Sequence, residues 1–124
     1  MAAPGTVIGW KLDRDDRAAL LDRHPPRYES VIADHVTLEV GAAGKPVPPV
    51  VEAQIIGHAD DSDGVEAMVV SIDGSSERPD GSVFHISWSL APGRKARESN
   101  DLLKGRGWRT FDQAIPIRLL PARF

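Results

Sequence analysis

The chain contains no cysteine among its 124 residues, which excludes disulfide bonds, thiolate nucleophiles, iron–sulfur clusters and thiolate zinc sites. It has no apolar run long enough for a membrane-spanning helix, and its first residues lack the basic start and apolar centre of a secretory signal. These absences predict a soluble, intracellular protein of the cytoplasm, without membrane association, whose stability comes from packing alone.

Disorder and a second domain are also poorly supported. Apolar residues make up 41% of the chain and charged residues 27%, which is ordinary for a globular protein. A length of 124 residues leaves little room for a second hydrophobic core. We therefore expect residues 1–124 to form a single folded domain, and the sequence leaves its oligomeric state open.

Basic residues are scarce in most of the chain and concentrated near its C-terminal end. Residues 1–91 contain 7 Lys and Arg against 15 Asp and Glu, a net charge of −8, whereas residues 92–124 contain 8 against 3, a net charge of +5. The basic segment suits a phosphate-bearing partner, although a solvated helix and loop would have the same composition. Because the rest of the chain is acidic, a small or single-stranded phosphate ligand fits better than duplex DNA.

The pattern of strand formers, turn residues and prolines predicts an α+β domain. A strand at residues 6–12 precedes a helix at 14–23, which Asp13 caps and the prolines after His24 end. The order βαββββαβ favours largely antiparallel sheets. The remaining elements are expected as strands at 31–40, 50–57, 65–72 and 83–90, a helix at 95–104 ended by Gly105, and a last strand at 115–120.

Two of the predicted strands repeat one pattern, an imidazole followed two residues later by a hydroxyl. The first reads HVTL from His35, and the second reads HISW from His85. Because side chains alternate faces along a strand, each histidine shares one face with its hydroxyl residue, Thr37 or Ser87, and the apolar residues share the other face. The duplication predicts one polar face on each of two strands.

Two imidazoles that face one cleft can divide the work of a general acid and a general base, because each titrates near neutral pH. In phosphodiester hydrolysis, the base takes a proton from the attacking water and the acid protonates the departing ribose oxygen. The two hydroxyls can hold the non-bridging oxygens, where negative charge develops. This chemistry requires no metal and no other cofactor.

The paired motifs resemble those of the two-histidine (2H) phosphoesterase superfamily, and most closely its compact branch of Swiss Army knife RNA repair-like proteins. The resemblance implies two lobes of antiparallel sheet around a central cleft, with two helices packed outside. It also implies a hydrolase that acts without a metal on a 2′,3′-cyclic or related ribose phosphodiester, on an RNA end or a nucleotide. By motif, His35 and His85 are then the catalytic pair, and Thr37 and Ser87 bind the phosphate. The motifs do not assign acid and base.

Residues outside the motifs have both functional and structural interpretations. Trp108 lies among glycines and arginines, where an indole can stack on a base, whereas Trp10 and Trp88 occupy core positions of predicted strands. His24 suits a structural role at a helix end. Possible substrate contacts in the basic segment are Lys95, Arg97, Arg106, Trp108 and Arg109.

Two metal sites and two other functions are alternatives to this prediction. His58 precedes an acidic turn at residues 60–64, but the calcium-loop pattern there is incomplete. His35 and His85 could bind a metal with Glu39, although a hydroxyl, which is a weak ligand, follows each histidine. The other functions are a non-catalytic module that binds a nucleotide or an RNA end, and a structural domain in which both histidines are incidental.

Overall fold

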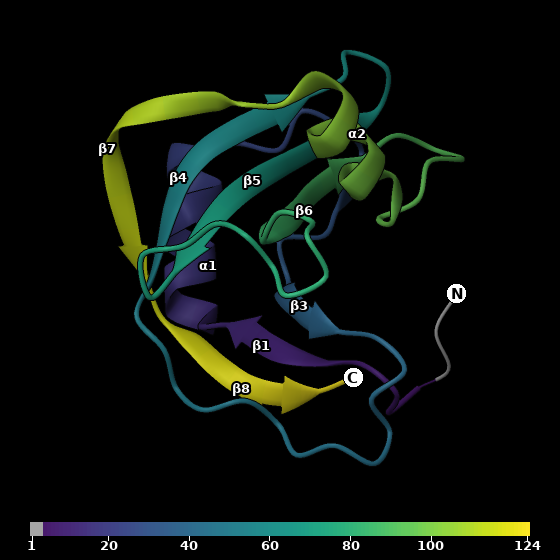
Figure 1. Ribbon diagram of the computed structural model, residues 1–124. Helices are drawn as coiled ribbons and strands as arrows, with labels where there is room; N and C mark the ends of the chain where they lie inside the picture. Colours follow the sequence, from purple (N-terminus) through teal and green to yellow (C-terminus); the bar gives the residue numbers. More distant parts are fainter. Residues whose placement is uncertain (1–3) are drawn as a thin grey trace.

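The computed structural model describes residues 4–124, which form two antiparallel β-sheets and two α-helices (Figure 1). The predicted α+β class is therefore confirmed. Within the described residues, neither helix is both long enough and apolar enough to cross a bilayer. The elements are β1 (Ile8–Leu12), α1 (Arg14–Arg23), β2 (Ser30–Val31), β3 (His35–Glu39), β4 (Ala53–Asp60), β5 (Val65–Ile72), β6 (His85–Leu90), α2 (Glu98–Arg106), β7 (Arg109–Ile117) and β8 (Leu119–Arg123).

The strands divide into a three-stranded sheet in the order β3-β1-β8 and a five-stranded sheet in the order β2-β6-β5-β4-β7. The strand predicted over 31–40 is split between them, because β2 pairs with β6 and β3 pairs with β1. Ala33 lies between these two strands, is fully buried and has a φ of 43°. This left-handed conformation is incompatible with continuous extended pairing, so the chain changes sheets here.

The C-terminal elements also differ from the prediction. Arg118 separates β7 from β8, so the strand expected over 115–120 belongs to both sheets. Helix α2 begins later than expected, at Glu98, and continues through Gly105 to Arg106. It ends at Gly107, whose φ of 72° is accessible to glycine at little cost and whose N–H bonds to the Leu103 carbonyl.

Each face of the five-stranded sheet is covered by a hydrophobic cluster. The main core lies between the two sheets and α1, and it contains both Trp10 and Trp88, as predicted. The second cluster joins the opposite face of the five-stranded sheet to α2 through Leu102 and Leu103. The two helices therefore cover opposite faces of this sheet, which determines the surroundings of every polar side chain on it.

Candidate active site

The two predicted catalytic histidines begin strands that contact each other, β3 and β6. In β3, Val36 is buried in the main core, and in β6, Ile86 is buried in the same core. Because successive side chains point to opposite faces of a sheet, His35 and His85 both lie on faces turned away from that core. The alternation expected from the sequence is present in both strands.

The His85 imidazole is held in place by its Nδ1 atom, which donates a hydrogen bond to the Val83 carbonyl at 2.8 Å. A carbonyl can only accept, so the proton of the neutral ring is on Nδ1 and Nε2 carries the lone pair. Burial lowers the pKa of His85, the bond to Val83 raises it, and the positive charges of Arg78 and His35 lower it further. The two histidines are therefore close enough to interact electrostatically, and the positive charge of His35 disfavours protonation of His85.

The His35 imidazole is held through the same atom, by the residue before it. Nδ1 lies 3.1 Å from Asp34 Oδ2, and the ring packs on Phe124 with 4.4 Å between ring centroids. The pKa of His35 is lowered overall, because burial outweighs the Asp34 carboxylate, which raises the pKa, and the positive charge of Lys11 lowers it further. Burial raises the pKa of the Asp34 carboxyl, but hydrogen bonds from Lys11 and the imidazole outweigh this and lower it to about 2. A permanent negative charge therefore accompanies His35.

The second ring nitrogen of both histidines is open to solvent. Two buried polar side-chain atoms in residues 4–124 lack a hydrogen-bond partner, His24 Nε2 and Asn100 Oδ1. The Nε2 atoms of His35 and His85 also lack a partner among these residues, but they are not buried, so water reaches both. A ring that is oriented through Nδ1 and accessible at Nε2 can exchange a proton with water or a ligand.

The two motif hydroxyls differ in availability. Thr37 is half-buried in β3, and its hydroxyl has no hydrogen-bond partner in the described part of the chain. Ser87 is buried beneath α2, where it donates to the Ala96 carbonyl at 3.2 Å and lies 3.0 Å from the Ser99 hydroxyl. Since its only proton is used, Ser87 attaches α2 to β6, and its contacts do not support the expected phosphate-binding role.

The five possible substrate contacts of the basic segment separate into two groups. Lys95 and Arg97 are exposed on either side of Ala96, whose carbonyl accepts the Ser87 bond, so they lie beside the second motif strand. The other three, Arg106, Trp108 and Arg109, lie at the end of α2 and the start of β7. They line a different cavity, together with Arg27 and His58 but without His35 or His85.

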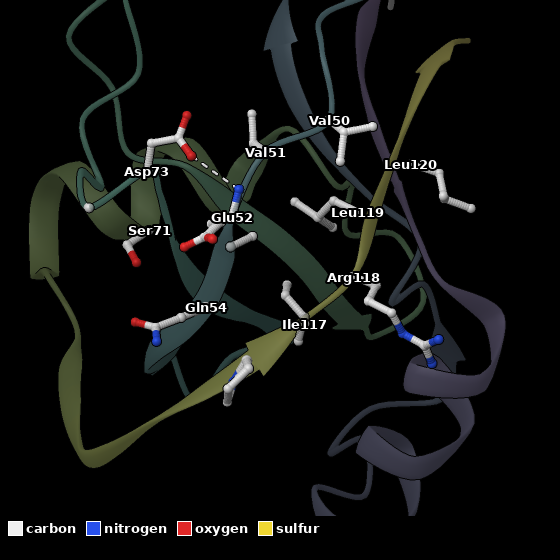
Figure 2. Close-up of a pocket in the computed structure, with 13 residues that line it drawn as sticks. Val50, Val51, Glu52, Gln54, Ser71, Asp73, Ile117, Arg118, Leu119 and Leu120 are labelled. Carbon is white, nitrogen blue, oxygen red and sulfur yellow. Dashed lines mark hydrogen bonds between the residues drawn. The ribbon is translucent and has the colours of Figure 1, made fainter.

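A large cavity of about 670 Å³ is lined by the segments 50–54 and 116–120 and is mainly apolar (Figure 2). Two of its charged groups already have partners, because Asp73 accepts from the Glu52 amide and Arg118 pairs with Asp16. A smaller cavity of about 420 Å³ opens beside Val83, whose carbonyl holds His85, and it contains Arg78 and Asn100. Neither His35 nor His85 is among the residues that line these two cavities, and the smaller one approaches His85 through Val83 and Arg78.

Sequence reasoning missed two charged residues near the histidines. Asp34 orients His35, and its position directly before the motif was a signal that could have been used. Arg78 acts on the pKa of His85 and is only 8% exposed, with its guanidinium bonded to Asp80. Nothing in the polar loop that contains Arg78 indicates that this loop folds back towards β6.

Neither of the alternative metal sites is formed. Within residues 4–124, no three His, Asp or Glu side chains are grouped so that they could hold a metal ion. In the acidic turn, Asp60 accepts from Arg27 and Tyr28, and Asp61 accepts from Arg94. Glu39, the third ligand of the other alternative, pairs with Lys45.

Comparison with known proteins adds no family assignment. No protein-family model, no curated protein and no solved structure matches the chain.

Proposed function

We propose that the protein is a metal-independent phosphoesterase that hydrolyses a 2′,3′-cyclic or related ribose phosphodiester on an RNA end or a nucleotide. The observation that carries the proposal is the pair of histidines on β3 and β6. His35 and His85 interact electrostatically, each is oriented through Nδ1, and each offers Nε2 to solvent. Paired imidazoles of this kind suit proton transfer in both directions.

In the proposed reaction, His85 is the base and His35 is the acid. Nε2 of His85 takes a proton from water as the water oxygen bonds to phosphorus, and the bond from phosphorus to one ribose oxygen breaks. Protonated His35 gives its Nε2 proton to that oxygen, so the products are a phosphate monoester and a free ribose hydroxyl. Asp34 supports this assignment because burial and a positive charge lower the pKa of both histidines, but only His35 has a carboxylate beside it, which favours its protonated form.

Several groups near the pair can bind the phosphate. The Thr37 hydroxyl follows His35 on the same face of β3 and has no protein partner among the described residues. Arg78 lies close to His85 but is bonded to Asp80, whereas Lys95 and Arg97 are exposed beside β6 and can reach an anion. Positive charge and hydroxyl donors aimed at the non-bridging oxygens stabilise the charge that develops on them.

The test is hydrolysis of 2′,3′-cyclic nucleotides by the purified protein with a chelator present, followed by phosphorus NMR. The expected result is conversion to one phosphate monoester at a rate that the chelator does not change. The second substrate is a short oligoribonucleotide with a cyclic phosphate end. Absence of turnover with both substrate types would contradict the proposal.

A second candidate function is a module that binds a nucleotide or an RNA end without turnover. The hydroxyl of Ser87 is already hydrogen-bonded within the protein, which favours this candidate. Only the Thr37 hydroxyl is then left to bind the phosphate, whereas the proposed reaction would use both. Titration of the protein with a nucleoside 2′-phosphate, followed through the imidazole NMR signals, separates the cases. Shifts of His35 and His85 signals without turnover would support the binding module.

A further inference from the structure

Two adjoining cavities lie along the β4–β7 edge of the five-stranded sheet, one beside α2 and the other beside the end of α1. Their volumes are about 360 and 240 Å³, and they share the residues Arg27, His58 and Arg109. His58 lies opposite Met68 in the β4–β5 pairing, and Met68 is part of the main core. His58 is therefore on the α1 face of the sheet, whereas His85 is on the α2 face.

Four arginines from different parts of the chain line these cavities. Arg23 ends α1, Arg27 follows it, Arg106 ends α2 and Arg109 begins β7. The side chains of Arg23 and Arg109 have no partner in residues 4–124, and Arg106 donates only to a backbone carbonyl, that of Asp61. We call Arg23, Arg27, His58, Arg106, Trp108 and Arg109 the arginine surface.

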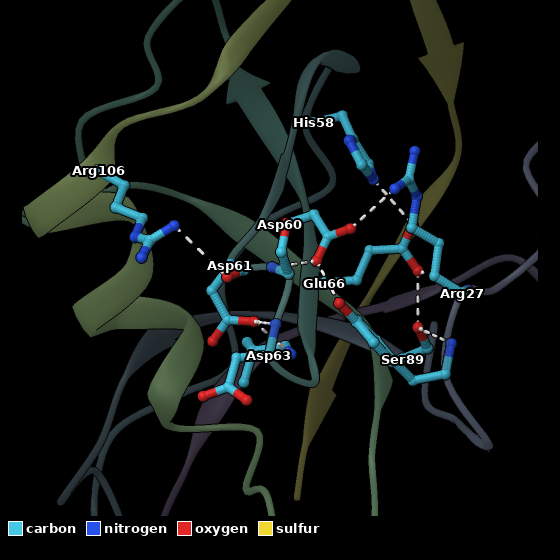
Figure 3. Close-up of polar contacts among 11 residues, drawn as sticks. Arg27, His58, Asp60, Asp61, Asp63, Glu66, Ser89 and Arg106 are labelled. Carbon is cyan, nitrogen blue, oxygen red and sulfur yellow. Dashed lines mark hydrogen bonds and ion pairs between the residues drawn. The ribbon is translucent and has the colours of Figure 1, made fainter.

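The acidic groups at the arginine surface are already engaged. Asp60 pairs with Arg27 at 3.0 Å and accepts from Tyr28. Glu66 is buried and accepts from the Ser89 hydroxyl at 2.6 Å and from the Arg27 amide at 3.1 Å, and its second oxygen is 2.7 Å from His58 Nε2 (Figure 3). Burial raises the pKa of Glu66, but these hydrogen bonds outweigh it and lower the pKa. The ionised carboxylate therefore holds Arg27 and His58 in position.

An aromatic ring stands beside the arginines. The Trp108 indole lies against the backbone of Gly57, where an added Cβ would come within 2.4 Å of Trp108 Cδ1. Trp108 is nevertheless 36% exposed. A partly exposed indole held on glycine backbone is a rigid surface on which a nucleic-acid base can stack.

We propose that the arginine surface binds a single-stranded polynucleotide, with phosphates on the arginines and a base on Trp108. The positive lining continues through two cavities, which suits several linked phosphates better than one. A duplex is disfavoured because residues 1–91 have a net charge of −8. This binding is a second function, separate from hydrolysis at His35 and His85, because it uses the β4–β7 edge of the sheet and neither histidine lines the two cavities.

The test is fluorescence anisotropy with labelled oligoribonucleotide and oligodeoxyribonucleotide probes of about ten nucleotides. Both probes should bind the intact protein, with affinity falling as salt increases. Replacing Arg23 and Arg109 together by alanine should weaken binding about tenfold or more at low salt. The double change should also reduce the slope of log affinity against log salt by about 1.4, since each phosphate contact on a single strand contributes about 0.7.

Two further variants separate stacking from charge. Trp108→Ala should weaken binding several-fold without changing the salt slope, because stacking releases no counterions. Lys45→Ala removes one exposed positive charge, which pairs with Glu39 away from the arginine surface, and should leave the affinity unchanged. Thermal unfolding of each variant checks that the fold is retained.

Three outcomes would overturn the inference: no binding by the intact protein at low salt, equal binding by Lys45→Ala and the double arginine variant, or equally tight binding of a nucleoside monophosphate. The double change His35→Ala and His85→Ala separates this inference from the proposed hydrolysis. That variant should lose turnover and keep its affinity for the polynucleotide. Failure of the hydrolysis assay alone would therefore leave the inference standing.

Discussion

His58 and His85 lie on opposite faces of the same sheet and use the same ring nitrogen differently. Nε2 of His58 is 2.7 Å from the carboxylate of Glu66, which is buried and ionised. Nε2 of His85 has no partner in residues 4–124 and reaches solvent, because this ring is held from the other side by the Val83 carbonyl. The Nε2 atom of His58 is therefore engaged within the fold, whereas that of His85 carries an available lone pair.

The comparison shows that the residue type alone does not decide the chemistry of a histidine. The decisive feature is the atom that fixes the ring, since a bond at Nδ1 leaves Nε2 available and a bond at Nε2 to a carboxylate removes it. His35 belongs with His85 in this respect, although its anchor is the charged Asp34. The difference between these two anchors is the basis for assigning His35 as acid and His85 as base.

The largest effect is expected when the histidines with an open Nε2 atom, His35 and His85, are replaced. His35→Ala and His85→Ala should each lower kcat for a 2′,3′-cyclic nucleotide about 10²–10⁴-fold, because each removes one proton-transfer group. The matched control is His24→Phe, which replaces a ring stacked on Phe111, and it should retain turnover. Steady-state kinetics measures the effect, and thermal unfolding confirms folding. Turnover of either alanine variant at the rate of the intact protein would show that the open nitrogens are not used.

The next largest effect is expected when Glu66, the partner of His58 Nε2, is replaced. Glu66→Ala should lower the free energy of unfolding by about 3–5 kcal/mol, because it leaves His58 and the Ser89 hydroxyl without their buried acceptor. Glu66→Gln keeps an acceptor oxygen but loses the charge, so it should lie between the alanine variant and the intact protein. Urea unfolding measures both changes. Equal stability of all three proteins would mean that the His58–Glu66 pair has no structural role.

The smallest effect is expected when the charge of Asp34, the residue that orients His35, is removed. The Asp34 carboxylate raises the pKa of His35, so Asp34→Asn should lower that pKa. Because the proposed acid must be protonated, the alkaline limb of the kcat profile should move to lower pH, and kcat above that limb should fall about tenfold for each unit of the shift. The profile is measured with a 2′,3′-cyclic nucleotide. A limb that does not move would instead assign the acid to His85.

Removing the Asp34 carboxyl should also change acid stability. The pKa of this carboxyl is about 2 in the folded protein against an ordinary value of 3.8. Since the folded value is the lower one, the carboxylate stabilises the fold above about pH 4, and this contribution is lost as the pH falls towards 2. The Asn variant should therefore lose less stability than the intact protein over this range.

The faces of His35 and His85 could be predicted because strand alternation is a local property of the chain. The limits of the strand at 31–40 could not, because the break depends on the backbone at Ala33 bonding to Ser87, a residue of another strand. The same alternation places Ser87 on the face of His85, which is why the sequence predicted that Ser87 binds the phosphate. Its actual partners are the Ala96 carbonyl, just before α2, and the Ser99 hydroxyl within α2, and nothing in the sequence around Ser87 indicates where this helix packs.

The sequence by itself determined the α+β class, both ends of α1 and the polar faces of the two motif strands. These features follow from secondary-structure propensity, helix capping and side-chain alternation, all of which act between near neighbours in the chain. Only the tertiary structure decided which ring nitrogens stay open and which arginines share a surface. Arg27 and Arg109 lie far apart in the sequence, and the Glu66 carboxylate that holds His58 belongs to a different strand. Such contacts depend on how sheets and helices pack, and no local pattern encodes them.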